Sequence, residues 1–388
     1  IAATRPVKVI SRPDQYVGIS TWSGDSAASR NIDIGIKKPD LVWVKNRFVA
    51  GRSHYLYDSV RGFGANKEIV SNTTDEEGST NHQTQNHGYV GGNTINGFTL
   101  IEGATNSNYT NQSGQSYVGW AWKAGGNKNT FNVDDVGYAS AAAAGLTAGD
   151  TTPTGCSVGT RQGFSIIKYD GKGTATSIPH GLSQAPEFVL VKNLANTYNW
   201  AVYHKGLTSA AYYLFLNNDD GQSNSYYTFW GSTDPSSTVI TLGVNNTDTN
   251  LNTNQPDVSH ICYAWHSVPG LQKFGSYTGN ATGNPFIELG FRPALLWIKN
   301  ISTGSTDWVV IDSQRQPFNQ SNLTKLYISS TSSESDIGVN SQMNLDFLSN
   351  GFKLRDSNNK VNASGDVYIY CAWAEAPSVD LFGGGANA

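Results

Sequence analysis

The stretch PDLVWVKN at residues 39–46 recurs twice further along the chain, as PEFVLVKN at 186–193 and PALLWIKN at 293–300. Three copies of one eight-residue phrase indicate an internal triplication. Positions 41–44 of the first copy are all apolar, a pattern typical of a strand buried on both faces. The sequence therefore predicts one β unit that occurs three times.

Two further landmarks keep the copies in register. An aromatic-x-Gly turn at Trp22, Tyr169 and Tyr277 precedes the proline of each copy by 16 or 17 residues. Each copy then ends in an aromatic strand that closes on Ala-Trp, at residues 117–122, 260–265 and 368–373. Because all three landmarks recur in the same order, the whole unit is repeated and not the phrase alone.

The units read as all-β. Short apolar strands alternate with Asn and Gly turns, and no window carries the 3.6-residue period of a helix. The expected fold is three tandem antiparallel β-sandwich domains of the jelly-roll or concanavalin-A-like kind, at residues 1–126, 161–269 and 270–377. Residues 127–160, rich in Ala, Gly and Thr, are interpreted as an insert or linker, and residues 378–388 as a flexible tail.

The amino-acid composition excludes two classes of function. Only 14% of the 388 residues are charged, against about 25% in an ordinary domain, and the net charge is −4. This balance gives no electrostatic footprint for nucleic acid or an anionic membrane, and no apolar run reaches the roughly 20 residues that span a bilayer. We therefore expect no nucleic-acid partner and no membrane insertion. The chain opens at Ile1 without Met, and we expect upstream sequence before it.

Catalytic and metal-binding motifs are weak. The acidic runs at residues 75–77, 134–135 and 219–220 lie in turn-like stretches and are expected to be solvated, although 219–221 resembles part of a calcium loop. No strand carries alternating acidic residues for glycoside hydrolysis, and no Gly-x-Ser-x-Gly elbow is present. We predict no enzyme activity, no catalytic residue, no metal and no cofactor. Cys262 and Cys371 are expected to be core side chains, and five histidines are expected to be satisfied or solvated: His54, His82, His87, His204 and His260.

One polar motif recurs at a strand end. Asp58 and Arg61 in the first unit match Asp312 and Arg315 in the third, whereas the second unit has His204-Lys205 there. The favoured interpretation is an ion pair that fixes an exposed turn and contributes about 0–1 kcal/mol. The alternative is a polar rim for a glycan, with a nearby tyrosine, Tyr55 or Tyr57, stacking on the sugar.

The tryptophans divide into two groups. Those at repeated landmarks are predicted to be core: Trp43, Trp122, Trp265, Trp297 and Trp373. In particular, Trp43, Leu190 and Trp297 occupy the same position of the repeated phrase and should lie in one buried layer. Tyr226, Tyr227 and Trp230 match no landmark and lie in a Ser/Asn-rich stretch. They are candidate glycan contacts, or a loop that folds back on its own core.

The longer phrases resemble a known family. These are PDLVWVKNR and SGQSYVGWAWKAGG, then FSIIKYDG and WAVYHKGL, then DWVVIDSQR and YIYCAWAEAP. They are similar to repeated β domains in virion structural and tail-fibre-like proteins of tailed phages, notably marine phages. The resemblance covers residues 15–377 and implies a concanavalin-A-like or jelly-roll sandwich and a role in the virion, without implying a reaction.

The expected function follows from this resemblance and from the lack of a catalytic motif. It is a non-enzymatic virion structural protein, part of a fibre, an appendage or a capsid-surface decoration, with some role in host adhesion. The implied partners are other virion proteins and further copies of the chain, with a trimer favoured, and the implied location is the virion surface. The alternatives are a carbohydrate-binding module for host surface glycan and, less favoured, an endoglycosidase or depolymerase.

Overall fold

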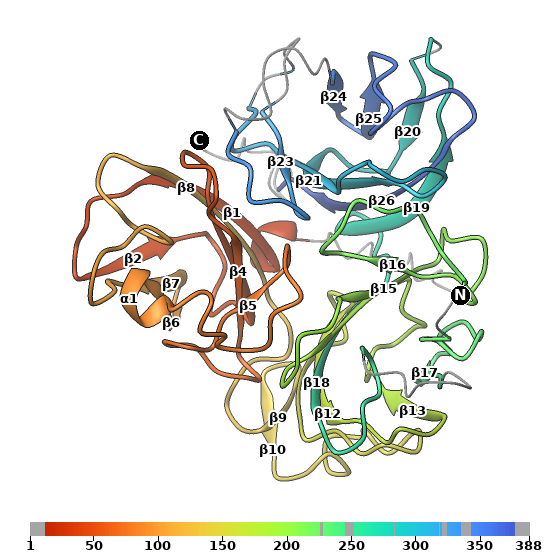
Figure 1. Ribbon diagram of the computed structural model, residues 1–388. Helices are drawn as coiled ribbons and strands as arrows, with labels where there is room; N and C mark the ends of the chain where they lie inside the picture. Colours follow the sequence, from red (N-terminus) through yellow and green to blue (C-terminus); the bar gives the residue numbers. More distant parts are fainter. Residues whose placement is uncertain are drawn as a thin grey trace, which may run out of the picture.

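A computed structural model describes residues 12–225, 228–244, 252–282, 284–317, 319, 324–334 and 343–376 (Figure 1). Strands account for 40% of the chain and helices for 2%, so the all-β prediction is confirmed. The helices among the described residues are the short η1 (Pro13–Gln15) and α1 (Thr84–His87). Neither of them is long and apolar enough to cross a membrane. The predicted tail, residues 378–388, lies outside the described residues.

Three antiparallel sheets, which we call the inner sheets, are built on one plan. In repeat 1 (residues 12–126) the strand order is β1-β8-β3-β4-β5. The repeated phrase forms β3, and the closing Ala-Trp strand forms β8 beside it, in register from Leu41 with Trp122 to Asn46 with Tyr117. The strands are β1 (Val17–Ser23), β8 (Ser116–Trp122), β3 (Leu41–Asn46), β4 (His54–Asp58) and β5 (Ile69–Val70).

Repeats 2 and 3 follow the same strand order. In repeat 2 (residues 127–269) it runs β12 (Phe164–Asp170), β18 (Ser259–Trp265), β14 (Phe188–Asn193), β15 (Ala201–His204) and β16 (Leu214–Phe215). In repeat 3 (residues 270–376) it runs β19 (Gln272–Thr278), β26 (Val367–Ala374), β21 (Pro293–Asn300), β22 (Val309–Asp312) and β23 (Leu326–Tyr327). The predicted triplication is therefore visible strand by strand.

The stretch 127–160 is not only a connection. It contains β9 (Phe131–Val133), β10 (Val136–Tyr138) and β11 (Gly155–Gly159), which extend the inner sheet of repeat 2 to eight strands. All five residues of β11 are buried, and β11 pairs antiparallel with β12. Its small residues suggested a linker, but small side chains also suit a strand that lies against a crowded surface.

A second, smaller sheet covers the outward face of each inner sheet. These outer sheets are β2 (Ser29–Asp33), β7 (Gly97–Ile101) and β6 (Tyr89–Thr94); β13 (Thr176–Pro179) and β17 (Val239–Leu242); and β20 (Phe286–Glu288), β25 (Gly351–Leu354) and β24 (Leu345–Leu348). An apolar core fills the space between the two sheets, as between Val42 on β3 and Phe98 on β7. Each repeat thus has two layers of strands.

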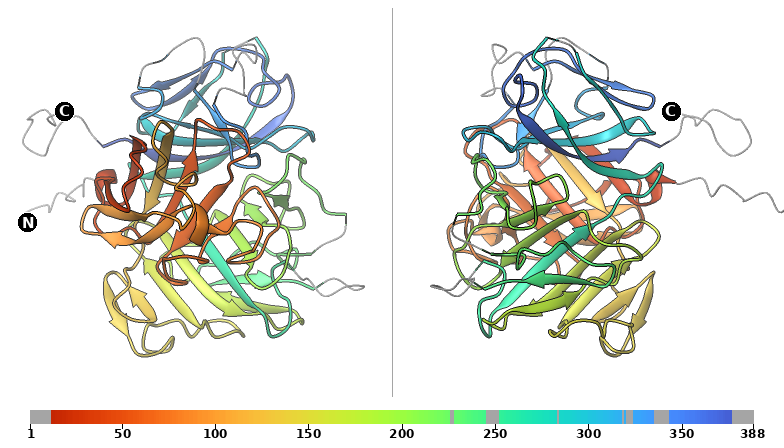
Figure 2. Two further views of the ribbon diagram at one scale, coloured as in Figure 1. Left: turned by 60° about the vertical axis from the view of Figure 1, so that its left-hand side comes forward. Right: turned by 90° about the vertical axis from the view of Figure 1, so that its right-hand side faces the viewer.

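The three inner sheets turn their other faces toward one another. Figures 1 and 2 show three lobes around a common centre, in place of the series of separate domains that the sequence suggested. One apolar cluster includes residues of all three repeats, among them Trp43, Leu190 and Trp297, which are 1%, 1% and 2% exposed. The prediction that these three residues share a buried layer is confirmed.

Three equivalent tryptophans mark the middle of this shared core. Trp122 and Trp265 are the last residues of β8 and β18, and Trp373 is the second-last residue of β26. Their ring centroids are 6.4 Å (Trp122–Trp265), 5.5 Å (Trp122–Trp373) and 6.4 Å (Trp265–Trp373) apart, with tilted edge-to-face planes. Each ring contacts the other two, so the repeats are arranged as a ring with approximate threefold symmetry.

Candidate functional site: the joints between repeats

The predicted glycan contacts are inside the molecule. Tyr55 is 1% exposed, Tyr57 and Asp58 are 0% exposed, and Arg61 is 7% exposed. A sugar in solvent cannot reach them, so the glycan rim proposed for this turn is wrong. The sequence pattern did not reveal this burial because it shows a strand end but not the neighbouring repeat that covers it.

Of the second set of candidate glycan contacts, the structure describes only Trp230. Trp230 is 1% exposed and packs edge-to-face on Tyr203, so its loop folds back on the core of repeat 2. Tyr226 and Tyr227 lie outside the described residues. The structure therefore supports the alternative interpretation for Trp230.

The two Asp–Arg motifs are ion pairs, as predicted. Arg61 Nε lies 2.5 Å from Asp58 Oδ2, and Arg315 Nε lies 2.6 Å from Asp312 Oδ2. The expectation that the pairs are exposed is wrong, because each of the four side chains is at most 1% accessible. Breaking a buried pair leaves a charge without a partner in a poorly solvating interior, which is far more costly than losing a surface pair.

These carboxylates also join one repeat to the next. Tyr263 of repeat 2 donates its hydroxyl to Asp58 of repeat 1 at 2.6 Å, and Trp120 of repeat 1 donates Nε1–H to Asp312 of repeat 3 at 3.0 Å. In repeat 2 the equivalent position is His204, whose Nε2 lies 3.2 Å from the carbonyl oxygen of Tyr370 in repeat 3. One polar contact of this kind thus lies at each of the three joints.

A second set of hydrogen bonds also joins each repeat to its neighbour, with one bond at each of the three joints. Trp200 Nε1 donates to the carbonyl of Val70 at 2.8 Å, and Trp308 Nε1 donates to that of Phe215 at 3.0 Å. The equivalent residue in repeat 1 is His54, whose Nε2 lies 3.0 Å from the carbonyl of Tyr327. Each ring nitrogen reaches the last residue of an edge strand in the neighbouring repeat, which satisfies a carbonyl group of that edge.

His54 has a defined protonation state. Its Nδ1 accepts a hydrogen bond from Trp43 Nε1 at 3.0 Å, so the ring proton must be on Nε2, which donates to Tyr327. Burial lowers the pKa of His54 well below its ordinary value, and the nearby Lys45 and Arg315 act in the same direction. The neutral imidazole is therefore part of the joint between repeats 1 and 3.

A third set links backbone to backbone. The amide nitrogens of Glu77, Gln222 and Glu334 each lie 3.0 Å from a carbonyl oxygen of the next repeat, in Leu194, Ile301 and Arg47 respectively. Glu334 also pairs with Arg47 Nε at 2.7 Å and with Arg315 Nη1 at 3.0 Å. Of the acidic runs expected to be solvated, residues 75–77 and 219–220 thus lie in loops that contact another repeat.

The Lys-Asn ending of the repeated phrase lies beneath these loops. Lys45, Lys192 and Lys299 are 0% exposed, and each donates from Nζ to the carbonyl of the following asparagine at 2.7–2.8 Å. Burial lowers the pKa of Lys192 and of Lys299 to about 7. The asparagine side chain accepts amide hydrogens of the next turn, as Asn46 does from Phe48 and Val49.

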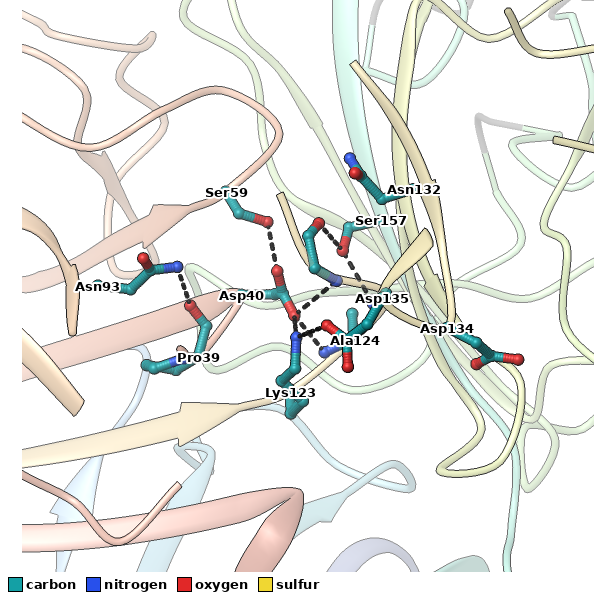
Figure 3. A network of polar contacts seen from close by, with 12 residues as sticks. Pro39, Asp40, Ser59, Asn93, Lys123, Ala124, Asn132, Asp134, Asp135 and Ser157 are labelled. Atoms are coloured by element: carbon teal, nitrogen blue, oxygen red, sulfur yellow. Dashed lines mark hydrogen bonds and ion pairs between the residues drawn. The ribbon is translucent and has the colours of Figure 1, made fainter. Parts of the chain in front are cut away.

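Asp40 is a buried polar residue that the sequence analysis did not single out. Its Oδ2 accepts hydrogen bonds from Lys123 Nζ at 3.0 Å, from the Ala124 amide at 2.7 Å and from the Gly126 amide at 3.2 Å, and Ser59 donates to Oδ1 (Figure 3). The network ties the start of β3 to the chain that leaves β8. At the equivalent position of repeat 2, Glu187 likewise accepts an amide hydrogen of the chain that leaves β18, from Ser267 at 3.0 Å, whereas repeat 3 has Ala294, whose side chain accepts no hydrogen bond.

The histidines outside the joints have local partners. His82 Nε2 lies 2.9 Å from Asp75 Oδ2, and His87 Nδ1 lies 3.1 Å from Asn106 Oδ1. In the part of the chain that the structure describes, no three His, Cys, Asp or Glu side chains gather in a way that suits a metal ion. Cys156, Cys262 and Cys371 are free thiols in the core, and burial raises the pKa of each.

Fold and contacts together define a class of protein: an all-β chain of three repeats closed into a ring, whose recurring polar residues hold the repeats together. The chain belongs to the family described as Domain of unknown function (DUF7483), whose model matches residues 12–377. No curated protein matches the sequence.

Proposed function

We propose that this chain is a non-enzymatic structural protein of a tailed-phage virion, part of a fibre, an appendage or a capsid-surface decoration, with each repeat a jelly-roll or concanavalin-A-like sandwich. The phrases at residues 39–46, 186–193 and 293–300 support this through their resemblance to virion proteins. The observation that carries the proposal is that the repeated polar residues hold the repeats together and do not line an accessible site. Asp58, Asp312, His54 and Lys299 are buried at or beside the joints, where they stabilise the ring and meet no solvent.

A ring of this kind suits a mechanical role. Three repeats share one apolar centre, so a force on one repeat is carried by the core of all three. Few charges and many Asn, Ser and Thr side chains keep the outer surface hydrated without attracting polyelectrolytes. The proposed partners are other virion proteins and further copies of the chain, and the proposed location is the particle surface.

Host adhesion is the second part of the proposal. Tyr55, Tyr57 and Trp230 are buried, so we propose the outer sheets and their turns as the surface for a glycan contact. Asn31 on β2 and Thr99 on β7 share a hydrogen bond of 2.7 Å on the exposed face of repeat 1, a polar surface of the sort that meets sugar hydroxyls. A carbohydrate-binding module is thus the alternative function, and a depolymerase is the least supported one.

Two measurements test the proposal. Mass spectrometry and immunogold labelling of purified virions from the phage that encodes the chain should find it on the particle surface. Its absence from intact particles would refute the structural role. A glycan array probed with the purified chain separates adhesion from a purely mechanical role, and release of reducing ends from host polysaccharide would favour the depolymerase.

A further inference from the structure

The three repeats differ at one edge of their inner sheets. In repeat 2 the strand equivalent to β1 is β12, and β11 covers its edge by pairing with it from Lys168 to Phe164. In repeat 3 the first strand, β19, is partly covered by its own preceding turn. There Val268 exchanges two backbone hydrogen bonds with Gln272, at 2.9 and 3.0 Å, and Ser267 Oγ accepts from the Phe274 amide.

The equivalent strand of repeat 1, β1, has no such cover among the described residues. Lys123 N donates to Tyr16 O and Gly24 N donates to Gln115 O, each at 2.8 Å. These two bonds, together with the register of β1 on β8, show that the backbone amide and carbonyl groups of the even-numbered residues of β1 point toward β8. The amide and carbonyl groups of Val17, Ile19 and Thr21 therefore point away from the sheet, and no described residue hydrogen-bonds to them.

This edge also lacks the usual protection. Exposed edges normally carry charged residues, proline or a bulge, which prevent pairing with another chain. Residues 17–23, VGISTWS, contain no charged residue and no proline, and the pairing with β8 runs without a register shift. The side chain of Ile19 is only partly buried, whereas the equivalent Ile166, beneath β11, is 0% exposed.

We propose that β1 pairs with β1 of a second copy of this chain, antiparallel and about a twofold axis at Ile19. The free groups repeat at every second residue, so Ile19 meets Ile19 of the other copy and Val17 meets Thr21. Every outward amide and carbonyl of these residues then has a partner. The two inner sheets become one continuous sheet across the contact.

The charges at the ends of β1 favour a second copy as the occupant. Arg12 and Asp14 pair at 2.7 Å before the strand, and Arg30 and Asp25 pair at 3.3 Å after it. Antiparallel pairing brings the start of one strand beside the end of the other, and both ends are locally neutral. Among the described residues at the two strand ends, no like-charge repulsion therefore opposes the contact. The assembly role of this dimer rests on the proposed virion function, but the pairing itself does not.

The first test uses the purified full chain. Light scattering across a concentration series should give the mass of two chains at high concentration, and Thr21→Pro, which removes an outward amide hydrogen, should give one chain with an unchanged melting temperature. Thr21→Lys is a second variant that keeps the backbone and adds an edge charge. Ser29→Lys, on the outer-sheet strand β2, is the matched control and should remain dimeric. A monomer at every concentration, a mass of three chains, or a dimer that survives both Thr21 variants would overturn the proposal.

A cross-link gives an independent test of the register. Ile19→Cys places a thiol opposite its own copy, and mild oxidation should yield a disulfide-linked dimer. The three native cysteines are buried and free, and Asn31→Cys on β2 is the control that should give no dimer. If Asn31→Cys cross-links as efficiently as Ile19→Cys, the pairing is not at β1. Neither experiment involves virions, so a failure here leaves the labelling of particles as a separate test of function.

Discussion

Tyr263 donates a hydrogen bond of 2.6 Å to Asp58, a residue 205 positions earlier in the chain and in another repeat. The same carboxylate accepts the amides of Val60 and Arg61 and the Nε–H of Arg61. One buried side chain thus shapes a turn, neutralises a guanidinium and holds two repeats together.

Replacing Asp58 should be strongly destabilising. Asp58→Asn or Asp58→Ala leaves Arg61 buried without its main counterion, and breaking a buried pair costs about 3–5 kcal/mol. We expect a loss of that size in the free energy of unfolding, measured by chemical denaturation. Asp25→Ala is the control, because the Asp25–Arg30 pair is half exposed and should be worth about 0–1 kcal/mol. Equal losses in the two variants would contradict the burial of Asp58.

Trp43 and Trp297 are equivalent positions with different polar partners. Either tryptophan changed to alanine should lower the free energy of unfolding by about 3–5 kcal/mol. Substitution by phenylalanine should have different effects at the two positions, because Trp43 Nε1 donates to His54, whereas Trp297 Nε1 has no hydrogen-bond partner among the described residues. Trp43→Phe leaves the Nδ1 of His54 unpaired and should cost about 1–3 kcal/mol more than Trp297→Phe. A larger loss for Trp297→Phe would argue against the contact with His54.

Acid should destabilise the ring before its carboxylates titrate. Burial lowers the pKa of His180 to about 4 and that of His204 to about 3, whereas an unfolded histidine titrates near 6.5. Between these values the unfolded chain binds more protons than the folded one, so the free energy of unfolding falls as the pH is lowered from about 6.5 to 4. Urea denaturation at several pH values measures this slope.

The variant His204→Gln isolates one contribution to that slope. Glutamine is neutral throughout and keeps an N–H donor for the carbonyl of Tyr370, so the pH dependence between 6.5 and 4 should become shallower. Asn31→Gln, at an exposed residue without a titratable group, serves as the control and should leave the slope unchanged. If His204→Gln has the full slope of the parent chain, His204 is not the buried neutral group described here.

Unfolding should be a single cooperative transition. Separate domains in series would melt independently, but the three repeats share one core that includes Trp122, Trp265 and Trp373. We expect one calorimetric peak whose van't Hoff enthalpy equals the calorimetric enthalpy. Limited proteolysis should release no stable single repeat. Two or three resolved peaks would show that the joints contribute little.

The sequence predicted the strands and the turns because a period of two and Asn-Gly dipeptides act over short distances. It predicted the burial of Trp43 and Trp297 because a landmark that recurs inside an apolar strand belongs to a core. The Asp58–Arg61 and Asp312–Arg315 pairs were also predictable, since the two members of each pair are only three residues apart.

The arrangement of the repeats was not predictable in the same way. A strand that is apolar on both faces, such as 41–46, must be covered twice, but the pattern does not say that the second cover is another repeat. For the same reason the sequence pattern predicts Asp58 and Tyr55 at the surface. Asp40 was missed because a single acidic residue after a proline looks the same whether solvent or a backbone amide binds it.

The cyclic contacts limit how many copies the chain can hold. In open repeat arrays each unit touches only its neighbours, and units are gained or lost with little effect on the rest. Here the last unit must return to the first, through Glu334 with Arg47 and through Ser71 with the carbonyl of Ile328. A duplication or deletion of one unit would leave Asp58, His54 or their equivalents facing no acceptor or donor. The closed ring therefore fixes the number of units at three. Sequence changes are tolerated in the turns and outer strands, but the number of units cannot change.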